Sequence, residues 1–213
     1  ISHDRHEAEG DPHFKQLFVA RSRGICQYVE RSVGPELSVD GNEAQNRTSF
    51  WTFTKLLATC EDREVKDRRE WHSSKLMDYD KFKSEVIIGQ KIEMDSSVLW
   101  KQIRTFIKGS IEAVQKGRPL IRQEYMDLGV RRCRLSPEQR KLAYDAFEIY
   151  ERYMTGSNNW DECDRIASLL RTLADDKEIR HELSFYKVYV DEIQDYTQAE
   201  VALFFMLCDH RGL

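Results

Sequence analysis

The sequence predicts an α/β fold in which a parallel β-sheet carries a large, mainly helical insertion. Two short apolar runs, residues 16–20 (QLFVA) and 186–190 (YKVYV), have the length and composition of strands buried in a parallel sheet. A helical pattern follows each run, and the long charged stretch between them has helical periodicity. This order of elements is typical of a parallel α/β core with an insertion between its strands.

The composition is that of a folded protein rich in charge. Hydrophobic residues make up 40% of the chain, which excludes a disordered tail. The formal net charge of -4 provides no overall basic field that would attract nucleic acid. A nucleic-acid partner would therefore have to bind in a local groove.

Cysteine and histidine spacing gives no sign of a disulfide framework or a metal site. The five cysteines lie far apart without a C-x-x-C pair, so we expect reduced thiols in an intracellular protein, nuclear or cytoplasmic. The histidines lack H-E-x-x-H spacing. The longest apolar run, residues 201–208, is shorter than the about 20 residues of a membrane span. We expect no membrane partner and no signal peptide.

The first part of the chain is expected to contain one strand and two helices. Residues 1–14 are polar and predict a connector, and Ser22 is a candidate N-cap for a helix that stops near Gly34. Residues 39–47 are loop-like. The apolar stretch 50–60 (FWTFTKLLATC) is predicted to be helical.

The middle of the chain is predicted to form helices with clear start and stop signals. An apolar stripe at helical spacing runs from Leu99 to Val114, with Gly109 as the expected break. Residues 136–139 (SPEQ) form a capping box that starts another helix. A further helix is predicted over residues 161–173, capped by its first aspartate.

Residues 188–198 (VYVDEIQDYTQ) carry the strongest chemical signal. An apolar strand that ends in Asp191 and Glu192 places both acids at the carboxyl edge of the sheet, where open α/β folds bind ligands. In nucleotide hydrolases the first acid of such a pair holds Mg²⁺ through water, and the second orients or deprotonates the attacking water. For a bare apolar-D-E pattern, however, a simple strand end is the better interpretation. Thr197 and Glu200 form a capping box for the next helix.

The longer pattern V-D-E-x-Q-D-x-x-Q, which includes Gln194, Asp195 and Gln198, resembles motif II of the UvrD/Rep-like superfamily 1 helicases almost letter for letter. The resemblance implies a partial RecA-like P-loop NTPase core in which this stretch is the Walker B motif. It implies that Asp191 binds Mg²⁺ through water and that Glu192 activates the attacking water. Gln194 would couple the nucleotide state to the neighbouring motifs.

The resemblance covers most of the chain. Residues 16–33 (QLFVARSRGICQYVERSV) look like the strand and helix of motif Ia, which contacts single-stranded DNA in the family. Residues 50–57 (FWTFTKLL) look like motif Ib, beside the DNA path. The residues that the resemblance assigns to nucleic-acid binding are Ala20, Arg21, Ser22, Trp51, Phe53 and Thr54. The threonine-asparagine pattern common in motif Ia is replaced here by A-R-S-R, and the two aromatic residues could pack as well as stack on bases.

The middle block is similar to one branch of the family. Residues 158–170 (NNWDECDRIASLL) are similar to an aspartate-rich helix that precedes motif II. Residues 100–153 resemble most closely the branch found in large tetratricopeptide and ankyrin repeat-containing proteins. The implied domains are residues 1–60 and 157–213 as two parts of the RecA-like core, with 61–156 as the inserted subdomain called 1B.

The Walker A pattern G-x-x-x-x-G-K-[ST] does not occur in the sequence. In the family this loop precedes motif Ia, while motif III and the arginine fingers follow motif II. We therefore expect a fragment that does not hydrolyse ATP alone and that needs the Walker A segment and second RecA-like domain of the same polypeptide. The other expected partners are ATP and single-stranded nucleic acid, DNA or RNA, with DNA the first expectation.

The function implied by the resemblance is the motor part of an ATP-dependent helicase or translocase, with Mg²⁺ as cofactor. The alternative is a catalytically inactive, helicase-like interaction platform in a large repeat protein. The intact acidic pair argues against the platform, and the altered motif Ia leaves it open. The basic cluster Arg131, Arg132 and Arg134 could touch a nucleic-acid backbone, but a solvated loop explains it better.

Overall fold

The computed structural model describes residues 15–37, 48–63, 71–129 and 131–209. The chain divides into two compact units, and two of the boundaries between them fall inside helices. The sheet unit consists of Ile1–Asp67, Thr172–Tyr196 and Leu203–Leu213, and the helical unit consists of Arg68–Arg171 and Thr197–Ala202. The predicted connector at 1–14 and the predicted loop at 39–47 lie outside the described residues.

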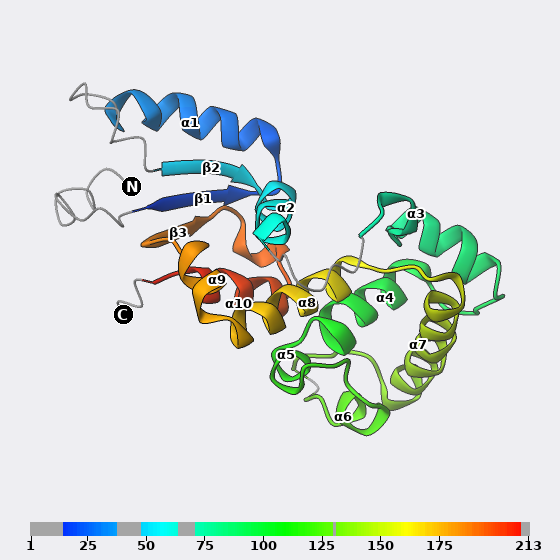
Figure 1. The fold of residues 1–213 in the computed structure, drawn as a ribbon. Helices are drawn as coiled ribbons and strands as arrows, with labels where there is room; N and C mark the ends of the chain where they lie inside the picture. Colours follow the sequence, from blue (N-terminus) through cyan, green and yellow to red (C-terminus); the bar gives the residue numbers. More distant parts are fainter. Residues whose placement is uncertain (1–14, 38–47, 64–70, 130, 210–213) are drawn as a thin grey trace. The chain divides into compact units, whose positions relative to one another are not determined.

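In the part of the chain that the structure describes, the sheet unit contains three parallel strands in the order β2-β1-β3 (Figure 1). They are β1 (Gln16–Ala20), β2 (Thr48–Thr52) and β3 (Lys187–Val190). Every residue of the central strand β1 is buried, as expected for a strand with neighbours on both sides. The α/β fold class with parallel strands is therefore confirmed.

Strand β2 corrects the helix predicted for residues 50–60. The structure forms a strand up to Thr52, and helix α2 (Phe53–Arg63) begins only afterwards. The hydroxyl of Thr52 accepts a hydrogen bond from the Lys55 N–H at 3.2 Å, so the helix start lies inside the apolar run. Short apolar runs rich in aromatic and β-branched residues satisfy both strand and helix patterns, which concealed the boundary.

Helix α1 (Arg23–Leu37) connects β1 to the next part of the sheet unit. As predicted, it begins after Ser22, whose hydroxyl accepts from the Ile25 N–H at 3.5 Å and whose carbonyl accepts from the Cys26 N–H at 3.2 Å. The helix ends at Leu37, past the predicted stop at Gly34. Helices α9 (Lys177–Glu182) and α10 (Gln198–Leu207) flank β3 in sequence.

The helical unit contains helices and turns, and the described residues from 71 to 157 contain no strand apart from an isolated bridge between Leu76 and Trp160. Its helices are α3 (Tyr79–Lys81), α4 (Ser96–Lys101), α5 (Ile111–Lys116), α6 (Arg122–Met126), α7 (Pro137–Ser157) and most of α8 (Glu162–Asp175). The segments Phe82–Ile88 and Gln102–Lys108 are π-helical, and Ser73–Lys75 forms a 3-10 turn.

Two predicted boundaries in the helical unit are confirmed. Ser136 and Gln139 form the capping box at the start of α7, with N–H to oxygen distances of 3.2 Å and 3.0 Å. The predicted break at Gly109 separates the second π-helical segment from α5. Helix α7 continues through Gly156 and ends before Asn158, which adopts the left-handed conformation.

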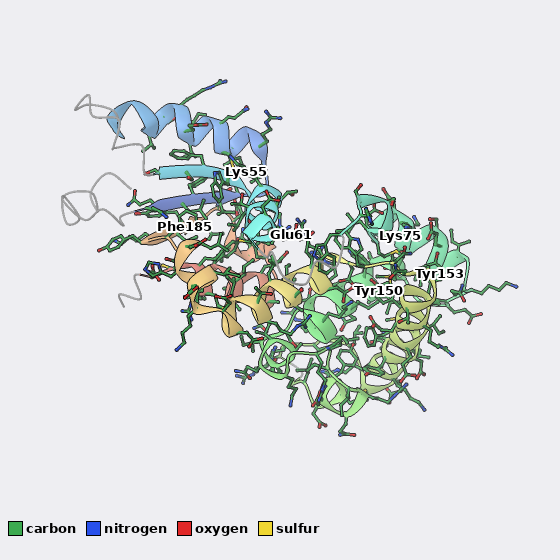
Figure 2. The ribbon with its side chains drawn as sticks, in the orientation of Figure 1. Lys55, Glu61, Lys75, Tyr150, Tyr153 and Phe185 are labelled. Atoms are coloured by element: carbon green, nitrogen blue, oxygen red, sulfur yellow. The ribbon has the colours of Figure 1, made fainter. Side chains whose placement is uncertain are left out.

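Apolar side chains fill the centre of the helical unit. Phe82, Leu99, Ile103 and Tyr150 are completely buried, and the last of these is labelled in Figure 2. Trp100 packs against Phe82 with ring centroids 4.8 Å apart.

A buried ion network crosses this apolar centre. Lys108, whose side chain is 4% exposed, places Nζ 2.7 Å from Asp161, 2.6 Å from Asp164 and 3.4 Å from Glu151. The Tyr150 hydroxyl donates to the same Asp161 carboxylate at 2.7 Å. Burial alone would lower the pKa of Lys108, but the three carboxylates outweigh it and raise the pKa well above its ordinary value. The lysine is therefore a buried cation that is fully compensated.

Asp161 also caps α8, as the sequence predicts. Its carboxylate accepts from the Asp164 N–H at 2.9 Å, and the Asp164 carboxylate accepts from the Asp161 N–H at 3.0 Å. Although burial opposes ionisation, the charge and hydrogen bond of Lys108 lower the pKa of Asp161. One aspartate thus joins the start of α8 to the buried lysine.

Removing this lysine should strongly destabilise the protein. We expect Lys108→Met to lower the free energy of unfolding by about 3–5 kcal/mol, because it leaves buried carboxylates without their cation. The matched control Lys101→Met changes an exposed lysine that precedes the same segment, and it should stay within about 0.5 kcal/mol of the wild type. Urea denaturation of both variants measures the difference, and equal effects would contradict a stabilising network.

Candidate functional site

The backbone fixes the acidic pair at the carboxyl edge of the sheet. The Asp191 N–H donates to the Val19 carbonyl at 2.9 Å, so the parallel ladder between β1 and β3 continues one residue beyond β3. Asp191 is partly exposed and Glu192 is exposed. Both acids therefore lie where open α/β sheets bind ligands. We refer to residues 191–196 as the acidic turn.

Glu192 has an unusual backbone conformation. Its φ of 49° and ψ of 53° lie in the left-handed region, where a residue with a Cβ atom costs roughly 1–2 kcal/mol. Strained residues of this kind cluster at functional sites. The Gln194 side-chain amide donates a hydrogen bond to the Glu192 carboxylate. The structure thus brings together two of the three predicted catalytic side chains.

The rest of the acidic turn is a short 3-10 helix, Ile193–Asp195, anchored by an aromatic residue. The Asp195 N–H donates to the Glu192 carbonyl at 2.9 Å, which closes the turn. Tyr196 follows and is buried, with edge-to-face contacts to Phe53 at 5.3 Å and to Phe204 at 5.1 Å between ring centroids. The acidic turn is therefore held at its end by packing against α2 and α10.

Arg21, the first residue after β1, reaches the acidic turn. Its guanidinium carbon lies 4.4 Å from the centroid of the Tyr196 ring and 5.0 Å from that of Phe53. One of its nitrogens also donates to the Asp195 carbonyl at 3.3 Å. Sequence reasoning assigned Arg21 and Phe53 to nucleic-acid contact and did not single out Tyr196. No local pattern links these residues, because the arginine and the turn are far apart in the chain.

The other predicted nucleic-acid contacts differ in their exposure. Ala20 is completely buried at the end of β1, and the Ser22 hydroxyl is used to cap α1. Trp51 is partly buried against Phe185, with ring centroids 5.7 Å apart, and Lys55 lies over its ring. The remaining two residues lie at the start of α2, where Phe53 is 3% exposed and Thr54 is exposed.

A neutral thiol lies close to the acidic turn. Cys26 is buried in the first turn of α1, and this burial raises the pKa of its thiol. The negative charges of Asp191 and Glu30 act in the same direction. The thiol is therefore protonated at neutral pH and adds no negative charge beside the carboxylates.

The donor set fits sparse magnesium ligation. Within the described parts of the chain, no three His, Cys, Asp or Glu side chains come together as a metal cage. Mg²⁺ bound to nucleotides takes one or two carboxylates and completes its shell with waters and phosphate oxygens. Asp191 and Glu192, adjacent and accessible at a strand end, match that requirement.

One further motif residue, Gln198, has contacts inside the helical unit. The Gln198 side-chain oxygen accepts from the Ile111 N–H and from Arg132, each at 3.0 Å. Arg132 also pairs with Glu112, which raises the pKa of the arginine. Thr197 and Glu200 form the predicted capping box of α10.

The chain is similar to a known family and, over part of its length, to a human protein. The family described as UvrD/REP helicase N-terminal domain matches residues 30–213. The human protein "TPR and ankyrin repeat-containing protein 1" is 33% identical over 130 residues, which cover 59% of this chain and 4% of the relative. The chain thus spans a small part of the length of that relative. No solved structure matches the chain. Among the described residues, no helix combines the length and apolar content needed to cross a membrane.

The left-handed conformation of Glu192 predicts that glycine at this position stabilises the protein. Glu192→Gly should raise the free energy of unfolding by about 1 kcal/mol, because glycine adopts this conformation without steric cost. The control Asp195→Gly changes an exposed residue of the same turn with helical geometry, and it should lower stability by about 0.5–1 kcal/mol. Thermal unfolding measures both variants. Destabilisation by Glu192→Gly would mean that contacts of the side chain outweigh the strain.

Proposed function

The chain belongs to the UvrD/REP helicase N-terminal domain family, and we propose that it forms the part of an ATP-dependent helicase or translocase motor that carries the hydrolysis motif. The observation that carries this proposal is the acidic turn. Asp191 and Glu192 follow a strand of a parallel sheet directly, at the edge where α/β folds bind nucleotides, and Gln194 contacts Glu192.

The proposed roles follow from the chemistry of the three side chains. Asp191 is partly exposed and held by its backbone, which suits a carboxylate that binds Mg²⁺ through water. Glu192 is exposed and can orient or deprotonate the attacking water. Gln194 donates a hydrogen bond to the Glu192 carboxylate, which supports the role of coupling this carboxylate to neighbouring motifs. When bound, Mg²⁺ neutralises charge that develops on the phosphates.

Single-stranded nucleic acid is the proposed second ligand, with DNA ahead of RNA. This part of the proposal rests on the family. Of the candidate contacts, the exposed Thr54, the partly exposed Trp51 and the exposed Arg21 have accessible surface, whereas Phe53 and Ala20 are buried. A base could stack on the accessible part of Trp51, as aromatic residues of single-strand binding proteins do.

The complete activity is proposed for the parent polypeptide. The 213 residues contain no Walker A pattern, so the phosphates of ATP would be bound by a segment from elsewhere in that polypeptide, and the chain alone should not hydrolyse ATP. We propose that the helical unit is the inserted subdomain, predicted at residues 61–156, between the two parts of a RecA-like core. None of the five cysteines, all of which lie in the described residues, is in a disulfide, which supports an intracellular, reducing compartment.

The central test of the function is Glu192→Gln in the parent protein. The amide keeps the size of the side chain but cannot take a proton, so ATP hydrolysis should fall by about 10²-fold or more, while ATP binding survives. A phosphate-release assay and a fluorescent-nucleotide binding assay measure the two quantities. The matched control Glu178→Gln changes an exposed glutamate on α9 and should leave the rate unchanged.

Asp191→Asn separates metal binding from base catalysis. A neutral amide is a poorer ligand for a hard cation, so the Mg²⁺ concentration needed for half-maximal hydrolysis should rise. Titrating Mg²⁺ at fixed ATP gives this value.

Unchanged hydrolysis with glutamine at position 192 would refute the catalytic assignment. A parent that neither binds nor hydrolyses ATP would instead favour the interaction platform.

A further inference from the structure

We propose that Arg21 is a positioning residue that clamps the acidic turn in the geometry that hydrolysis requires. This inference rests on the proposed function of that turn and assigns a new role to a residue that the family pattern associates with nucleic acid. The clamp consists of Arg21, Phe53 and Tyr196, with the Asp195 carbonyl as its hydrogen-bond acceptor.

The geometry of the clamp is that of a cation packed over two aromatic rings. The guanidinium carbon of Arg21 lies 4.4 Å from the Tyr196 centroid and 5.0 Å from the Phe53 centroid, both within the about 6 Å range of cation–π attraction. The two rings contact each other edge to face at 5.3 Å. Arginine suits this place because its planar guanidinium can stack and donate at the same time.

The clamp joins three segments that are distant in sequence. Arg21 directly follows β1, Phe53 is the first residue of α2, and Tyr196 directly follows the 3-10 part of the acidic turn. The hydrogen bond to Asp195 holds the turn by its backbone. Movement of Arg21 would therefore remove one of the contacts that hold the end of the turn, while the packing of Tyr196 against Phe53 would remain.

The acidic turn needs such support. Glu192 is in a left-handed conformation that persists only when the surrounding structure determines it. The Asp195 N–H closes the turn on the Glu192 carbonyl, and the Arg21 side chain holds the carbonyl of the same Asp195. Arg21 is thus connected to Glu192, the proposed base, through the backbone of Asp195 alone. A lost clamp would let the carboxylate leave its productive position.

The packing also explains why Arg21 does not act mainly on nucleic acid. Its guanidinium already interacts with two rings and a carbonyl of its own chain. Turning outward toward a phosphate would give up these contacts. We therefore expect substitution of Arg21 to change the chemical step more than the affinity for a strand.

The test uses the parent protein and four variants. Arg21→Gln removes the cation, Tyr196→Leu removes the ring, Tyr196→Phe retains the ring, and Arg31→Gln changes an exposed arginine on α1 as the matched control. For each, we would measure kcat and KM for ATP without nucleic acid, the dissociation constant for a fluorescein-labelled dT oligonucleotide, and the thermal midpoint. Hydrogen exchange of the peptide covering residues 191–196 reports on the turn directly.

We expect Arg21→Gln and Tyr196→Leu to lower kcat by about 10- to 100-fold, as small misplacements of catalytic groups do. KM for ATP and the oligonucleotide dissociation constant should stay within about threefold. Exchange of residues 191–196 should become faster. Tyr196→Phe should restore kcat to within about threefold of the wild type, and Arg31→Gln should match it.

Three results would overturn the clamp. Weaker oligonucleotide binding with an unchanged basal kcat would make Arg21 a nucleic-acid contact. A lower thermal midpoint with unchanged kcat per folded molecule would make it merely structural. Exchange at residues 191–196 that is unchanged in Arg21→Gln would exclude a clamp even in a protein that does not hydrolyse ATP. Failure of the proposed function is distinct, since it appears as wild-type protein without hydrolysis.

Discussion

The placement of the candidate site depends on the alignment of β1 with its two neighbours. Val19 pairs with Trp51 on one side and with Val190 on the other, and its carbonyl accepts the hydrogen bond of Asp191. A shift of one residue in either pairing would turn every side chain of that strand to the opposite face. Because β1 is completely buried, such a shift is costly, and one alignment brings Arg21, Thr52 and the acidic turn to the same edge.

A buried polar residue supports this alignment from the other end of β1. Gln16 is 1% exposed, donates to the Tyr189 hydroxyl at 3.3 Å and accepts from the Thr48 hydroxyl at 3.2 Å. Buried amides that lose their partners cost about 1–3 kcal/mol, so the amide of Gln16 favours the observed pairing on both sides. Burial of the apolar residues of β1 stabilises the strand inside the sheet. The hydrogen bonds of the Gln16 amide help to select the register in which β1 pairs with its neighbours.

Features with a local signal could be predicted from the sequence, and features that depend on distant contacts could not. The strands β1 and β3 and the caps at Ser136 and Asp161 follow from adjacent residues, and the acidic pair follows from its place after a strand. The boundary at Thr52 was concealed because aromatic residues fit both a strand and a helix. No local pattern singles out Lys108, because its three carboxylate partners lie far along the chain.

The same division applies to the candidate site. The types and order of Asp191, Glu192 and Gln194 can be read from the sequence. The left-handed backbone conformation at Glu192 could not be predicted, because glutamate rarely adopts it. Arg21 and its hydrogen-bond acceptor Asp195 are 174 positions apart in the sequence, and Tyr196, on which Arg21 stacks, is the next residue. No window of sequence contains both partners.

The strain at Glu192 bears on the choice between a motor and an interaction platform. A platform requires a stable core and an exposed surface, and neither requires a glutamate in a conformation that glycine would adopt at lower cost. The carboxylate is exposed, so it contributes no core packing, yet the Gln194 amide orients it. A strained backbone beneath an oriented acid at the ligand-binding edge of a parallel sheet is the pattern expected where the side chain performs chemistry. The physical chemistry of this one turn therefore supports the motor over the platform.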